Sequence, residues 1–114
     1  MELGAAGETL VASYLESLGA KVIAKNWRIK EGEIDLIARH NGTLLFIEVK
    51  SRSNAKFGHP LEAIGREKAH RLQRLALAWV ATHDLWGADY RIDCAAVDFT
   101  DRLNPAIDYR PGVL

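Results

Sequence analysis

Hydrophobic residues recur along the chain with two different periods, which predict two helices and at least four strands. Residues 5–18 and 63–83 carry apolar residues at helical spacing. Shorter apolar stretches bounded by turn residues predict strands at 21–29, 33–39, 43–50 and 89–99, with a short edge strand after Asn104-Pro105. The order α-β-β-β-α-β predicts an α/β fold with a mixed central sheet flanked by helices.

The Asn41-Gly42 pair predicts a tight hairpin between the second and third strands. With those two residues as the loop, His40 pairs with Thr43, and the register of the whole hairpin follows. One face then holds the apolar pairs Ala38–Leu45, Leu36–Ile47 and Ile34–Val49. The other face holds Ile37–Phe46, Asp35–Glu48 and Glu33–Lys50. Because both faces are largely apolar, we expect these to be central strands covered on both sides.

This register sets two carboxylates, Asp35 and Glu48, against each other. Directly opposed side chains have Cβ atoms about 4.5–5.5 Å apart, and like charges there destabilise a sheet. A shared proton would offset the repulsion, and a divalent cation would do so better, because it takes oxygen ligands at about that separation. Lys50 would lie on the same face, two residues after Glu48.

A metal, two carboxylates and a lysine can hydrolyse a phosphodiester. The metal lowers the pKa of a bound water, and the ammonium orients that water or stabilises the charge that builds on the phosphate. In the alternative interpretation, Glu33 and Lys50 form an ordinary cross-strand ion pair, and Asp35 and Glu48 are merely solvated.

Residues on the two predicted helices point toward the same sheet. Glu8 lies three, four and seven residues before Val11, Ala12 and Leu15, so it begins the inward stripe of the first helix. Lys68 lies four residues before Leu72 and begins the inward stripe of the second helix. Lys68 can therefore reach the site of Asp35 and Glu48 and contact a phosphate there. In the alternative interpretation, its ammonium extends into solvent.

Several stretches together resemble the YraN-like family of small bacterial proteins, and more broadly the PD-(D/E)xK nuclease superfamily, which includes the archaeal Holliday-junction resolvases. They are "GETLVASYL", "NWR", "GEIDLIA", "FIEVKSR", "GREKAHRLQRLA" and "RIDCAAV", and they cover nearly the whole chain. Ile34 stands where the superfamily motif has its nominal proline. Family members often carry a short segment before the first helix, which could contribute to binding.

The resemblance implies a restriction-endonuclease-like fold and a catalytic set of Asp35, Glu48, Lys50 and Glu8. Asp35 and Glu48 would be the main ligands of Mg²⁺ or Mn²⁺, Glu8 a further ligand and Lys50 the catalytic lysine. The substrate would be DNA, branched or a recombination intermediate. Symmetric DNA junctions suit a protein dimer with two-fold symmetry, so the resemblance also suggests a homodimer.

Composition narrows the class of protein. The 114 residues, 48% of them hydrophobic, predict a single nuclease-like domain over residues 1–114. The single cysteine, Cys94, forms no intramolecular disulfide and is expected to be a small core residue. No run is long and apolar enough to span a bilayer, and the N-terminus lacks the pattern of a signal peptide, so we expect a soluble protein of the cytoplasm.

The formal net charge is zero, but residues 39–74 hold eight Lys and Arg against three Glu, a net of +5. A local basic patch can contact phosphates, although charge alone favours a solvated helix face. The predicted nucleic-acid contacts are Arg52, Lys56, Lys68 and Arg71.

Two functions fit these residues. The first is a metal-dependent DNA endonuclease, and the second is a non-catalytic nucleic-acid-binding module with the same fold. The clustered carboxylates favour the first, because a pure binder gains nothing from negative charge beside phosphates. Asp93 has no role that the sequence reveals, and His59 has no His or Cys at metal-binding spacing.

Overall fold

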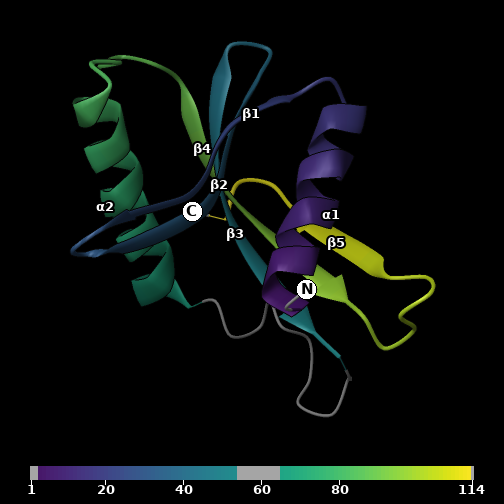
Figure 1. The fold of residues 1–114 in the computed structure, drawn as a ribbon. Coiled ribbons are helices and arrows are strands. Elements are labelled where there is room, and N and C mark those ends of the chain that lie inside the picture. The colour runs from purple at the N-terminus through teal and green to yellow at the C-terminus, as the bar shows by residue number, and fades with distance from the viewer. Residues whose placement is uncertain (1–2, 54–64, 114) are drawn as a thin grey trace.

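A five-stranded sheet lies between two helices in the computed structural model, which describes residues 3–53 and 65–113 (Figure 1). The elements are α1 (Leu3–Ser17), β1 (Lys21–Ile29), β2 (Gly32–His40), β3 (Thr43–Arg52), α2 (Arg66–Thr82), β4 (Tyr90–Asp98) and β5 (Ala106–Arg110). The predicted α/β class and the α-β-β-β-α-β order are confirmed, and β5 is the predicted edge strand. Within the described ranges, neither helix is long and apolar enough to cross a membrane.

The strands follow the order of the sequence across the sheet, from β1 at one edge to β5 at the other. All neighbours are antiparallel except β3 and β4, which run parallel because α2 lies between them in the chain. β3 is therefore the middle strand, flanked by β2 and β4.

Both faces of the sheet are buried, as the two-sided apolar pattern predicts. Helices α1 and α2 lie on opposite sides of it (Figure 1). The cluster under α1 is built from Val11, Ala12, Leu15, Leu36, Ala38, Leu45, Ile47, Ala95 and Val97. The cluster under α2 is built from Ile34, Ile37, Leu44, Phe46, Leu72, Leu75, Ala76, Trp79, Val80 and Ile92. β2 and β3 contribute to both clusters, so the hairpin is the centre of the core.

The predicted hairpin register is confirmed from the turn as far as the Leu36–Ile47 pair. Asn41 and Gly42 have φ angles of 50° and 80°, the left-handed conformation that a tight two-residue hairpin loop requires. His40 pairs with Thr43, and Ile37 pairs with Phe46, as expected.

Beyond Leu36–Ile47 the predicted register is wrong. The ladder ends there, and the Val49 N–H donates to Oδ2 of the Asp35 carboxylate at 2.8 Å instead of to a main-chain carbonyl. The predicted pairs Asp35–Glu48, Ile34–Val49 and Glu33–Lys50 therefore do not form in the ladder. Ile34 also lies under α2, whereas Leu36 lies under α1, so the alternation of β2 breaks at Asp35.

Gly7 brings α1 unusually close to the sheet. A Cβ atom at this position would overlap Oγ of Ser51 on β3. A larger residue at this position would require Ser51 or α1 to shift, and the next residue is Glu8.

Asp93 is a fully buried carboxylate on β4 that joins three segments. It accepts two hydrogen bonds from Arg91, at 2.7 and 2.9 Å, and one from the Tyr109 hydroxyl on β5. The Gly112 N–H in the tail donates to it at 2.9 Å. A buried carboxylate is tolerated only when it is paired and hydrogen-bonded in this way, so Asp93 fastens β5 and the tail to β4.

Candidate active site

The point where β2 and β3 diverge forms a pocket of about 290 Å³ between the sheet and α2. Asp35 lies beside the last hairpin pair, and Glu48 lies on the neighbouring strand. The pocket is lined by Gly32, Glu33, Asp35, Glu48, Lys68, Arg71, Leu72 and Leu75. It therefore unites two predicted metal ligands, Asp35 and Glu48, with two predicted phosphate contacts, Lys68 and Arg71.

Three carboxylates, one from α1 and two from β2, form a cluster to which the pocket residues Glu33 and Asp35 belong. Glu8, Glu33 and Asp35 each place one oxygen within 4.8 Å of the others. Glu8 thus meets Asp35, as its place on the inward stripe of α1 predicts. Glu33 is the third member of this cluster, in place of the expected Glu48.

Asp35 has an unusual proton affinity for an aspartate. Its burial raises its pKa to about 7, and the negative charges of Glu48, Glu8 and Glu33 contribute in the same direction. The hydrogen bond from Val49 works against the shift but does not cancel it. Near neutral pH, the carboxylate therefore gains from a proton or from any other positive charge at this place.

This raised pKa predicts that the protein loses stability as the pH rises from about 4 to about 7. In that window, Asp35 ionises in the unfolded chain but retains its proton in the folded chain, so folding binds a proton and becomes less favourable with pH. Asp35→Asn removes the charge and retains an oxygen for the Val49 N–H.

We expect the variant to melt about 4 °C or more above the wild type at pH 8 without metal, the shift that roughly 1 kcal/mol produces in a domain of about this size. The difference should vanish near pH 4. Thermal unfolding followed by circular dichroism across this range measures it, and a difference independent of pH would contradict the assignment.

Glu48 is buried and faces two lysines. Its Oε1 lies 2.8 Å from Nζ of Lys68 and 3.4 Å from Nζ of Lys50. The interaction with Lys68, followed by burial, lowers the pKa of Lys50. Burial lowers the pKa of Lys68, but its side-chain interactions with Glu48 and Lys50 outweigh burial and raise that pKa overall. Lys68 therefore carries the positive charge that pairs with Glu48, and Lys50 is the more easily deprotonated of the two.

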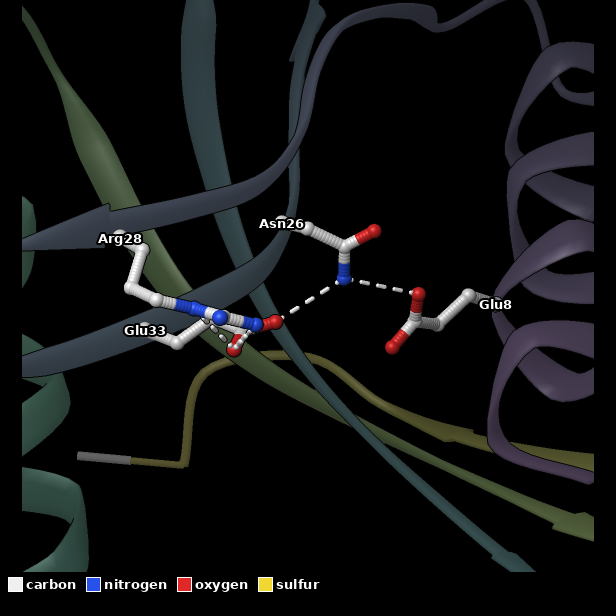
Figure 2. A network of polar contacts seen from close by, with 4 residues as sticks. All are labelled: Glu8, Asn26, Arg28 and Glu33. Atoms are coloured by element: carbon white, nitrogen blue, oxygen red, sulfur yellow. Dashed lines mark hydrogen bonds and ion pairs between the residues drawn. The ribbon is translucent and has the colours of Figure 1, made fainter. Parts of the chain in front are cut away.

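Two residues of β1 that the sequence analysis did not select hold the acidic cluster together (Figure 2). The Asn26 amide nitrogen donates to one oxygen of Glu8 and to one of Glu33, at 2.9 Å each. Arg28 donates twice to the other oxygen of Glu33, at 3.0 and 2.8 Å. The alternative in which Glu33 pairs with Lys50 is therefore wrong, since Glu33 pairs with Arg28 and Lys50 with Glu48.

The pairing of β1 with β2, if predicted from the sequence, would have placed Asn26 and Arg28 beside the acidic residues. The turn at residues 30 and 31 sets Arg28 opposite Glu33, and the structure confirms that pair. Asn26 lies between the pairs Trp27–Ile34 and Lys25–Leu36, which puts it across from Asp35. Asn26 has a φ of 51°, a left-handed conformation that asparagine tolerates better than most residues.

The remaining predicted residues lie around or outside the pocket. Arg52 ends β3 beside Asp98, and its buried Nε has no hydrogen-bond partner among the described residues. Lys56 and His59 lie outside the described residues. Cys94 is buried next to Glu48, which confirms the predicted core residue, and burial raises the pKa of its thiol to about 12.

Fold and site together define the class of this protein as a mixed α/β domain with a pocket of carboxylates and basic side chains between the sheet and α2. The chain belongs to the family described as "Uncharacterised protein family UPF0102", the YraN-like family, whose model matches residues 7–97. The matched segment contains every residue of the acidic cluster and both lysines.

Similar proteins from several bacteria match over most of their length. A UPF0102 protein of Beutenbergia cavernae is 50% identical over 97% of this chain and 94% of its own. One from Leifsonia xyli is 44% identical over 99% and 96%, and one from Nocardia farcinica is 43% identical over 97% and 87%.

Proposed function

We propose that this protein is a metal-dependent endonuclease that hydrolyses phosphodiester bonds in DNA, acting on branched or recombination intermediates. The observation that carries the proposal is one pocket that brings Glu33 and Asp35 of the three-carboxylate cluster together with the lysine-paired Glu48 and with Arg71. Clustered carboxylates with a raised aspartate pKa, beside basic groups in one pocket, are typical of functional sites. The resemblance to PD-(D/E)xK nucleases supports the same reaction.

The donor set fits a hard divalent cation. Glu8, Glu33 and Asp35 offer only oxygen, the element that Mg²⁺ and Mn²⁺ prefer. One oxygen of each lies within 4.8 Å of the others, so these three residues would hold the cation together. A bound cation would supply a water of lowered pKa and would polarise a phosphate oxygen.

The side chains of the pocket divide the remaining work. Asp35 and Glu8 would hold the cation, and Asn26 keeps Glu8 and Glu33 facing each other. The ammonium of Lys50, which is partly exposed beside Glu48, orients the attacking water or stabilises the negative charge that develops on the phosphate. Arg71, which lines the pocket, binds the phosphates of the DNA strand.

One feature favours a second function, a nucleic-acid-binding module without catalysis. The Asn26 amide already bridges Glu8 and Glu33, and Lys68 already neutralises Glu48. The carboxylates are therefore partly satisfied by the protein alone, as a binder without metal would require.

A cleavage assay separates the two functions. Single-stranded, duplex, flap and four-way-junction DNA are incubated with the protein, with Mn²⁺ or with EDTA. Endonuclease activity predicts Mn²⁺-dependent products that are internal to the strand, most of them from the branched substrates. Binding to all four DNAs without products under either condition would establish the binding module and overturn the nuclease.

A further inference from the structure

A second pocket, of about 350 Å³, lies between α2 and the turn from β1 to β2. It adjoins the pocket lined by Glu33, Asp35 and Glu48, which we call the acidic pocket. The second pocket is lined by Ile29, Glu31, Arg71, Arg74, Leu75 and Ala78. The two pockets share Arg71 and Leu75, so an occupant of the second lies next to the pocket that Glu33, Asp35 and Glu48 line. We call the second pocket the turn pocket.

The lining of the turn pocket suits a flat, partly apolar group. Leu75 is buried, Ile29 and Ala78 are half-buried, and together they form an apolar wall. The guanidinium groups of Arg71 and Arg74 offer planes on which an aromatic ring can stack. No carboxylate of a described residue lies within ion-pair distance of either arginine, so both remain available to a ligand.

Glu31 supplies the polar contact. Its carboxylate can accept a hydrogen bond from the amino group of cytosine, adenine or guanine, and it repels phosphates. A nucleotide would therefore enter with its base toward the turn and its phosphates toward Arg71. This orientation places a phosphate on the side that the acidic pocket shares.

We propose that the turn pocket binds an unpaired nucleobase next to the phosphate that is cleaved, an inference that rests on the proposed function. A base inside a duplex is stacked on both sides and paired along its edge, so it cannot enter such a pocket. The substrate would then be a single-stranded segment, such as a flap or the unpaired bases at a branch. Continuous duplex would bind only through its phosphates.

The test measures binding by fluorescence anisotropy in EDTA, so that it does not depend on metal or cleavage. Three labelled DNAs of equal length are compared: a mixed-sequence single strand, a blunt duplex and an all-abasic strand. Ala78→Leu fills the turn pocket without touching the acidic one. Ala81→Leu, on the exposed side of the same helix, makes the identical change elsewhere.

We expect the wild-type protein to bind the single strand about tenfold more tightly than the abasic strand, in line with the effect of one stacked base. Ala78→Leu should remove that preference and leave binding to the abasic strand and the duplex within about twofold. Ala81→Leu should behave as the wild type. If Ala78→Leu melts at a much lower temperature than the wild type, the test is repeated with Arg74→Gln and with Arg66→Gln as its control.

Equal losses on all three DNAs, no loss on any, or equal wild-type affinity for the base-bearing and abasic strands would each overturn the base pocket. Because no cleavage is measured, a protein without nuclease activity can still show the base preference. An active nuclease can equally lack that preference.

Discussion

Asp35→Asn is expected to abolish Mn²⁺-dependent cleavage while the variant remains folded. The substitution removes one charged ligand of the proposed cation and retains the acceptor for the Val49 N–H. A bound cation contributes several kcal/mol to stabilising charge in the transition state, so the rate should fall at least about a thousandfold. Single-turnover cleavage of the best substrate measures the loss. Glu16→Gln, an exposed carboxylate on α1, serves as the control.

The same variant should lose the thermal response to metal. A ligand that binds only the folded chain stabilises it by about 2.7 kcal/mol at a hundredfold excess over its dissociation constant, so millimolar Mn²⁺ should raise the melting temperature of the wild type. Asp35→Asn should show no rise, whereas Lys50→Ala should retain the rise and lose cleavage, because lysine serves chemistry rather than coordination. If Mn²⁺ leaves the wild type unchanged and Asp35→Asn is destabilising, Asp35 is only a structural acceptor for Val49.

Asp93→Ala is expected to destabilise the fold by about 3 kcal/mol, since three donors lose their acceptor at about 1 kcal/mol each. The change leaves the Tyr109 hydroxyl, the Arg91 guanidinium and the Gly112 N–H without their acceptor. Urea denaturation measures the loss.

Tyr109→Phe provides the matched comparison for Asp93→Ala. It removes one hydrogen bond and leaves the carboxylate paired with Arg91, so it should cost only about 1–2 kcal/mol. Similar losses in the two variants would show that Asp93 does not join the three segments through its charge.

The central hairpin could be predicted because its signals are local. Asn41-Gly42 fixed the turn, and strict alternation carried the register to Leu36–Ile47. The prediction failed at Asp35 because alternation assumes that every strand residue is paired through its main chain. A side chain that replaces a main-chain acceptor, as Asp35 does for Val49, leaves no trace in the hydrophobic pattern.

The site was predicted only in part, because some of its residues are placed by local spacing and others by the pairing of distant segments. Glu8 and Lys68 could be placed because each begins the apolar stripe of a helix, and helical spacing fixes direction. Asn26 and Arg28 were missed because their role depends on how β1 pairs with β2. Asp93 could not be interpreted, since its partners Tyr109 and Gly112 come from segments whose position only the fold determines.

The close packing at Gly7 has a consequence for genetics. Within a helix, alanine is ordinarily a better residue than glycine, so helix propensity alone would predict that Gly7→Ala is harmless or beneficial. Here the added methyl group would press on Ser51 and move α1 outward, and Glu8 would move with it, away from Asp35. A screen for loss-of-function alleles would therefore return Gly7 together with the carboxylates, although it contributes no functional group. Its phenotype would be that of a misplaced ligand in a protein that still folds.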